Sequence, residues 1–323
     1  MSARRKGAKR KPGAKKTALP RMRYKTLRVE TANGVRHIVL SRADAYNTIT
    51  PRLRDELAHA IDAADAARDV RVILLRAEGP AFCAGYGLDW STRAQAAESE
   101  APAAQELGAA PWQPGNAERL KRAKAWDSVA DLRMMGEYVV TYMKLWYAKK
   151  PTLAAVQGWC IGGGTDLVLC ADLIVAADDA RFGYPPSRVW GTPTTAMWVY
   201  RMGLEKAKRY MLTGDEISAK RAAEIGMILE AVPAKTLLAH ATALAERMAR
   251  VPTNQLVMLK LLCNQTAESM GLAHSRLLGT LFDGIARHTQ EGLDFVARAQ
   301  AAGFREAVRE RDDAFGDYGS KRR

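Results

Sequence analysis

The alternation of apolar and polar residues predicts strands and a helix in the first quarter of the chain. Residues 27–32 and 35–40 have strand-like patterns, and Asn33-Gly34 between them is a strong signal for a tight hairpin turn. A threonine followed by a proline then predicts the start of a helix, whose apolar residues repeat at helical spacing from Pro51 to about Ala67. A further strand is predicted over 70–76.

The rest of the chain repeats this alternation and then becomes helical. A helix near 126–148 precedes a buried strand over 152–156, a helix over 163–170 and a strand over 172–176. Strands alternating with helices predict an α/β core of repeated β-β-α units. After a strand near 226–231, the pattern predicts a C-terminal helical region with helices at about 234–250, 253–268, 270–287 and 289–302.

Charge and composition divide the chain further. Residues 1–25 hold 11 basic residues and no acidic one, so removing them from the net charge of +14 leaves about +3 for the remaining 298 residues. We therefore predict a disordered basic tail over 1–23, a core over 24–232, a helical region over 233–315 and a short tail over 316–323. Within the core, the proline-interrupted stretch 91–125 is interpreted as an insertion that either covers a pocket or elaborates the surface.

Composition also limits the kinds of protein that this chain can be. No apolar run approaches the length of a membrane span, and the N-terminus lacks the apolar segment of a secretory signal, which predicts a soluble cytoplasmic protein. The four cysteines form no Cys-x-x-Cys pair and no histidine-rich tract accompanies them, so no metal site is expected. All four are predicted to be buried free thiols.

The most informative residues lie in the turn between a predicted strand and the helix that follows it. Gly162, Gly163 and Gly164 carry no side chains there, so a ligand oxygen can approach backbone N–H groups at a helix N-terminus, where an anion is favoured. A second glycine-broken loop, 79–89, follows the strand-like run 72–76. One N–H donor from each loop would make a two-point oxyanion hole, which stabilises the enolate of a carbonyl compound.

At these residues the chain resembles the crotonase superfamily, the enoyl-CoA hydratases and isomerases. The resemblance runs from about Tyr24 to about Phe304, and its matching segments are 40–47, 82–85, 150–183, 212–219 and 223–227. It implies a crotonase-type spiral of β-β-α units and a C-terminal helical oligomerisation region that builds a homotrimer or homohexamer. It also implies an acyl-CoA or enoyl-CoA substrate and no further cofactor, since CoA is part of the substrate.

The resemblance assigns roles to individual residues. The oxyanion donors would be the backbone N–H groups of Tyr86 and Gly163. The first of the two glutamates used by the hydratases corresponds to Asp166, and the second to Pro186, which cannot transfer a proton. The CoA moiety would lie against Arg42, Ala45, Tyr46, Ala84, Gly85, Gly87, Leu88, Asp89 and Gly162.

Several reactions remain open with one carboxylate in place. An enoyl-CoA hydratase with Asp166 as its single acid/base is the leading prediction, and an enoyl-CoA isomerase or acyl-CoA hydrolase is the alternative. Gly158-Trp159-Cys160-Ile161-Gly162 has nucleophile-elbow spacing, but a core thiol is the stronger interpretation of Cys160. A hypothesis outside the enzyme class is a catalytically weak relative that acts as a binding protein, with its basic tail contacting a polyanion such as nucleic acid. Apart from this tail, no contact with nucleic acid or membrane is expected.

Overall fold

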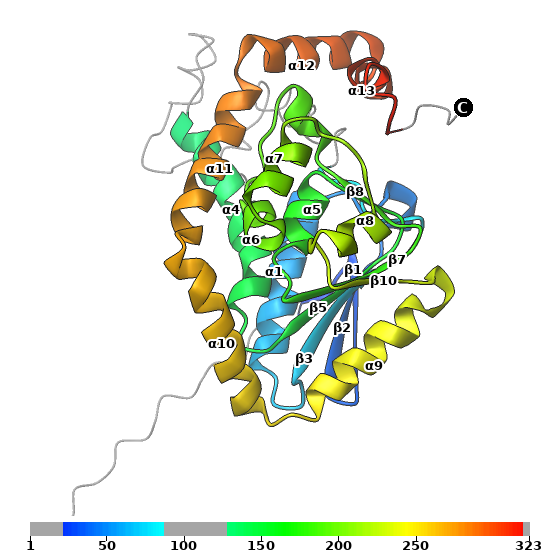
Figure 1. The fold of residues 1–323 in the computed structure, drawn as a ribbon, viewed down its shortest axis with the longest axis vertical. Helices are drawn as coiled ribbons and strands as arrows, with labels where there is room; N and C mark the ends of the chain where they lie inside the picture. Colours follow the sequence, from blue (N-terminus) through cyan, green and yellow to red (C-terminus); the bar gives the residue numbers. More distant parts are fainter. Residues whose placement is uncertain (1–21, 87–127, 319–323) are drawn as a thin grey trace, which may run out of the picture.

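The computed structural model describes residues 22–86 and 128–318, and these form two sheets surrounded by helices (Figure 1). The larger sheet has six strands in the order β1 (Leu27–Ala32), β2 (Val35–Leu40), β3 (Val72–Ala77), β5 (Thr152–Val156), β7 (Leu173–Ala177) and β10 (Glu230–Val232). The smaller sheet has four, in the order β4 (Ala81–Cys83), β6 (Trp159–Ile161), β8 (Arg181–Gly183) and β9 (Ile217–Ser218).

The two sheets are built by strand pairs that follow one another along the chain. In each of the pairs β3–β4, β5–β6 and β7–β8, the first strand joins the six-stranded sheet and the second joins the four-stranded one. Helix α5 (Gly163–Val168) follows β6, which completes a β-β-α unit. Strands β3, β5 and β7 pair in parallel and are almost entirely buried, as strands covered on both faces must be. The α/β fold of repeated β-β-α units is confirmed.

The N-terminal hairpin and the first helix form for local reasons. Asn33 and Gly34 both have positive φ, 51° and 78°, which suits the twist of a two-residue turn between antiparallel β1 and β2. Helix α1 (Pro51–Ala66) begins after Thr50, whose side chain accepts a hydrogen bond from the Leu53 N–H at 3.2 Å. Figure 1 places α1 and α9 on opposite sides of β2 and β3.

The remaining helices cover the sheets and extend beyond them. α4 packs on α1, and α11 packs on α4, so the C-terminal region folds back over the first half of the chain. The helices not yet given bounds are α4 (Ser128–Tyr147), α6 (Met197–Met202), α7 (Leu204–Met211), α8 (Ala219–Glu224), α9 (Leu237–Ala249), α10 (Thr253–Ser269), α11 (Leu272–Arg287), α12 (Gln290–Ala302) and α13 (Phe304–Asp313). Short 3-10 helices are η1 (Ala43–Ala45), η3 (Pro185–Arg188) and η4 (Ala234–Thr236).

Two expectations from the sequence need correction. The strand predicted over 226–231 forms only at Glu230–Val232, because the preceding residues make a turn that ends with the Leu229 N–H donating to the Ile174 carbonyl. Cys263 is exposed on α10, whereas the other three cysteines are buried as predicted. The insertion 91–125 and most of the basic tail lie outside the described residues.

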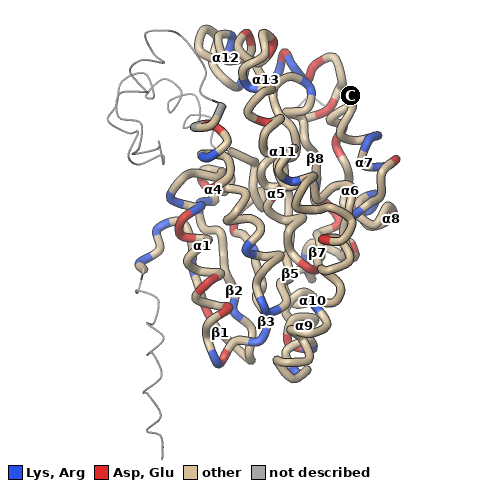
Figure 2. Tube along the Cα trace, turned by 90° about the vertical axis from the view of Figure 1, so that its left-hand side faces the viewer, with Lys and Arg blue, Asp and Glu red and all other residues tan. Residues whose placement is uncertain are grey.

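The surface of the described residues carries charges of both signs. Figure 2 shows basic and acidic residues interspersed along α1 and over α12 and α13. Across residues 22–86 and 128–318, no helix is both long enough and apolar enough to cross a membrane.

Candidate active site

The glycine triplet forms a sharp turn between β6 and α5. Gly162, the residue before the helix, has φ 55°, a left-handed conformation that favours glycine, and its N–H donates to the Gly183 carbonyl at 2.9 Å. A Cβ added to Gly164 would lie 2.4 Å from the backbone oxygen of Cys83, so glycine lets α5 approach β4. Gly163 then supplies the first N–H of the helix, which has no partner within a helical ladder.

The second loop lies against the first. Gly85 has φ 88°, and a Cβ placed on it would lie 2.9 Å from the Ile161 oxygen and 3.6 Å from the Gly163 nitrogen. Its own carbonyl accepts from the Ile49 N–H at 2.8 Å. Tyr86 follows it, with its ring 2.8 Å from the position of a Cβ on Gly163. The structure therefore brings together Tyr86 and Gly163, the two predicted oxyanion residues.

Asp166 lies in the first turn of α5 and is fully buried. One carboxylate oxygen accepts from the Thr194 N–H at 3.0 Å and from the Thr194 hydroxyl at 2.9 Å, and the other accepts from the Thr195 hydroxyl at 3.2 Å. Burial raises the pKa of Asp166 from 3.8 to about 7, an effect that the threonine donors oppose and the nearby Asp283 carboxylate reinforces. The group can therefore gain or lose a proton near neutral pH.

Pro186 is the second residue of η3 and faces the glycine turn. Its Cγ lies 3.6 Å from the position of a Cβ on Gly162. Its carbonyl accepts from the N–H groups of Val189, Trp190 and Gly191 at 2.9 to 3.1 Å, which fixes the turn. The residue predicted to stand in place of the second glutamate thus lies beside the glycine turn at Gly162, where it offers no proton.

A second buried carboxylate was missed by the sequence analysis. Asp283 of α11 is 6% exposed, is ion-paired with Arg287, and accepts from the Thr192 N–H at 3.4 Å. Arg287 also pairs with Asp131 of α4 at 2.5 Å. Burial raises the pKa of Asp283, an effect that the Arg287 guanidinium opposes. The available signal was a carboxylate within the apolar helical run Leu281-Phe282-Asp283-Gly284-Ile285.

Three tyrosines, Tyr86, Tyr142 and Tyr184, lie near these groups. The Tyr142 hydroxyl donates to the Tyr86 hydroxyl at 3.1 Å, and the Tyr184 hydroxyl donates to the Thr192 carbonyl at 2.8 Å. Burial raises the pKa values of all three phenols well above their usual range, so they remain neutral. Neutral phenols can orient a water molecule but cannot act as bases near neutral pH.

The residues predicted to bind CoA are placed only in part. Arg42 donates through its guanidinium to the Thr48 carbonyl at 2.9 Å, and Tyr46 is 53% exposed. Ala45 ends η1, and the Ala84 N–H donates to the Tyr46 carbonyl at 3.1 Å, which joins this segment to the loop that carries Gly85. Gly87, Leu88 and Asp89 lie outside the described residues.

Cys160 has the surroundings of a core thiol. It is fully buried in β6, opposite Cys83 of β4. Burial raises the pKa of its thiol well above the usual value, which disfavours the thiolate needed for nucleophilic attack.

Comparison with known proteins agrees with this fold. The family model of enoyl-CoA hydratase/isomerase matches residues 30–111 and 123–304, and the chain belongs to this family. A crystal structure of an enoyl-CoA hydratase from Mycobacterium smegmatis is similar, with a TM-score of 0.79 and 40% identity over 92% of this chain and 96% of that one. An enoyl-CoA hydratase/isomerase from Xanthobacter autotrophicus Py2 has a TM-score of 0.74 and 27% identity, covering 91% of this chain and 99% of that one. Hydroxycinnamoyl-CoA hydratase-lyase of Pseudomonas fluorescens is 29% identical over 65% of this chain and 68% of its own length.

Proposed function

We propose that this protein adds water to the C2=C3 double bond of a 2-enoyl-CoA thioester. The observation that carries the proposal is Asp166, a fully buried carboxyl group with a pKa of about 7 on the same helix whose first N–H belongs to Gly163. A titratable carboxyl beside an oxyanion hole combines the two functions that hydration needs.

The proposed reaction begins at the thioester carbonyl. Its oxygen accepts hydrogen bonds from the backbone N–H groups of Tyr86 and Gly163, which stabilise the negative charge that develops as the enolate forms. The oxygen of water bonds to C3 while one water proton passes to Asp166. The same carboxyl then returns a proton to C2, so the net change is the addition of one water molecule. Losing one oxyanion donor in such a site costs roughly 3 kcal/mol of transition-state stabilisation.

The test is hydration of short and medium trans-2-enoyl-CoA thioesters by the wild type and by Asp166→Asn. General acid–base groups contribute on the order of 10²- to 10⁴-fold, so kcat should fall by at least about 100-fold in the variant. Asp172→Asn is the matched control, because Asp172 is a carboxylate of the following segment that pairs with Lys260 at 2.8 Å in a structural contact. It should lower stability while the folded fraction keeps its kcat.

Pro186 supports an alternative within the same family. Without a second carboxylate at this position, one base suffices for moving a double bond or for activating water against the thioester carbonyl. Wild-type protein that binds enoyl-CoA thioesters without hydrating them would contradict the hydratase proposal. Isomerised thioester or free CoA among the products would then identify the isomerase or the hydrolase.

A further inference from the structure

Asp283 lies next to the position where the second family carboxylate is missing. A Cβ placed on Gly191 would lie 2.9 Å from the Pro186 Cβ and 3.4 Å from an Asp283 carboxylate oxygen. Pro186 in turn faces the glycine turn at Gly162. Because Gly191 has no side chain, the Asp283 carboxylate on α11 can approach Pro186.

One short segment contacts both buried carboxylates. The Thr192 N–H donates to Asp283, and two residues later the N–H and hydroxyl of Thr194 donate to Asp166. Each carboxylate raises the pKa values of both the Tyr86 and the Tyr184 phenols, which places the two charges around the same aromatic side chains. Asp283 also raises the pKa of Asp166 itself. The two carboxylates therefore lie at either end of the segment 192–194.

The ion pair of Asp283 with Arg287 distinguishes its surroundings from those of Asp166. Arg287 lies against one carboxylate oxygen and favours the ionised form, whereas the hydrogen-bond donors to Asp166 are neutral threonines. The other oxygen of Asp283 is the one that faces Thr192 and Gly191. Two carboxylates whose surroundings separate their proton affinities are suited to act as one base and one acid.

We propose that Asp283 is the second catalytic carboxylate and takes the role that Pro186 cannot fill. This inference rests on the proposed hydratase function. In this two-carboxylate form of the reaction, ionised Asp283 replaces Asp166 as the group that accepts a proton from water while the water oxygen bonds to C3. Asp166 begins protonated and gives its proton to C2 as the enolate collapses. Exchange with solvent then returns both groups to their starting states, so the balance remains one water molecule added.

The closing experiment compares Asp283→Asn with Asp131→Asn in the full chain. Both variants remove one carboxylate from Arg287, so a purely structural role predicts equal losses. If Asp283 is catalytic, its variant lowers kcat at least 100-fold, keeps the wild-type Kd for a saturated acyl-CoA, and Asp131→Asn stays within about threefold of wild-type kcat. Equal effects of the two variants, or unchanged kcat in Asp283→Asn, would overturn the proposal.

The same assay separates this inference from the proposed function. Failure of the wild type to hydrate any enoyl-CoA rejects the hydratase, and with it the role of Asp283 in hydration. Hydration by the wild type with full activity in Asp283→Asn rejects only the second carboxylate. If Asp283→Asn does not fold, Asp283→Glu keeps the charge and displaces the base. Its kcat should then fall at least tenfold, and a wild-type kcat would count against the proposal.

Discussion

At the scale of single residues, the surroundings of Asp166 determine its chemistry. Its hydrogen-bond donors, Thr194 and Thr195, are neutral, so they offset only part of the free energy lost when the carboxylate leaves water. The raised pKa of about 7 that results is suited to proton transfer at neutral pH. The same shift makes the ionised group a source of instability.

This instability predicts an effect of pH on the free energy of unfolding. Between pH 4 and pH 7 the folded state binds a proton at Asp166 that the unfolded state has lost, so stability falls as pH rises through this window. The penalty is absent below pH 4, complete above pH 7, and on the order of 4 kcal/mol. Asp166→Asn should lose correspondingly less stability than the wild type between pH 4 and pH 8 in urea unfolding. Parallel pH profiles for the two proteins would contradict the assigned pKa.

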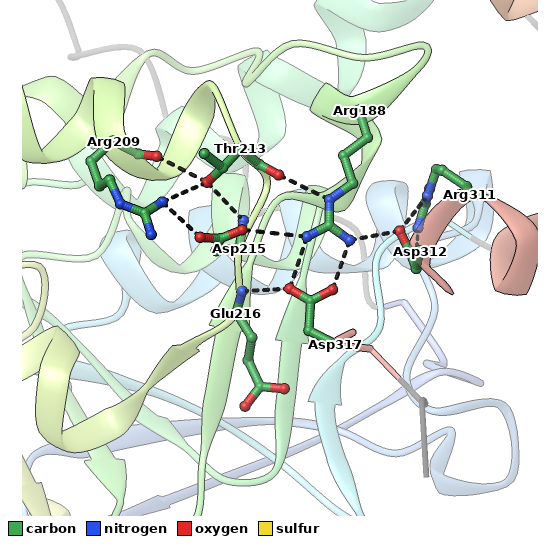
Figure 3. Close-up of polar contacts among 8 residues, drawn as sticks. All are labelled: Arg188, Arg209, Thr213, Asp215, Glu216, Arg311, Asp312 and Asp317. Carbon is green, nitrogen blue, oxygen red and sulfur yellow. Dashed lines mark hydrogen bonds and ion pairs between the residues drawn. The ribbon is translucent and has the colours of Figure 1, made fainter. Parts of the chain in front are cut away.

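At the scale of elements, η3 joins the site to the C-terminal segment through Arg188 (Figure 3). The Arg188 side chain is 2% exposed and pairs with Asp312 at 2.9 Å and with Asp317 at 2.7 Å. It also donates to the Thr213 carbonyl at 2.9 Å and lies 3.8 Å from the centre of the Phe315 ring. One guanidinium thus holds together η3, the turn after α7 and the chain after α13.

Arg188→Gln should destabilise the protein by roughly 3 kcal/mol, because it removes a buried cation that pairs with Asp317 and leaves the buried Asp312 with Arg311 alone. Chemical denaturation monitored by circular dichroism measures the loss. Arg309→Gln is the control, since Arg309 pairs with Glu306 and Asp313 on the exposed side of α13 and its replacement should leave the unfolding midpoint nearly unchanged. Similar midpoint shifts in the two variants would show that the buried network is not what stabilises this junction.

At the scale of the whole molecule, α10 and α11 run along one edge of the fold (Figure 1), and large apolar side chains are exposed on both helices. Large exposed apolar groups are a feature of protein–protein interfaces. The residues of this α10–α11 surface, including Met270 in the turn between the two helices, are Met258, Leu259, Leu261, Leu262, Met270, Leu277, Leu278, Phe282 and Ile285. They support the expectation, still a prediction, that this helical region assembles the chain into a trimer or hexamer.

Leu262→Glu should shift the protein toward monomer in analytical ultracentrifugation, because a charge at the centre of a buried interface is costly. Leu262 is 70% exposed in the single chain. Leu212→Glu is the control, since Leu212 is 82% exposed but follows α7, outside the α10–α11 surface. A wild type that sediments as a monomer would refute the assembly, and a Leu262→Glu variant that assembles like the wild type would refute this surface as its interface.

The sequence by itself determined the features that depend on neighbouring residues. The Asn33-Gly34 turn, the Thr50 cap and the glycine turn before α5 follow from backbone preferences that a few adjacent residues satisfy. The resemblance to the crotonase superfamily singled out Asp166 and Pro186, and the structure places both beside that glycine turn.

Only the tertiary structure decided which distant groups meet. Asp283 reaches Gly191 because α11 folds back against α4, and Arg188 meets Asp312 and Asp317 because residues 312–317 pack beside η3. Packing likewise leaves Cys263 exposed on a helix whose pattern suggested burial. A carboxylate's proton affinity depends on the charges and solvent around it in space, so the second carboxylate of the site could not be found from spacing along the chain.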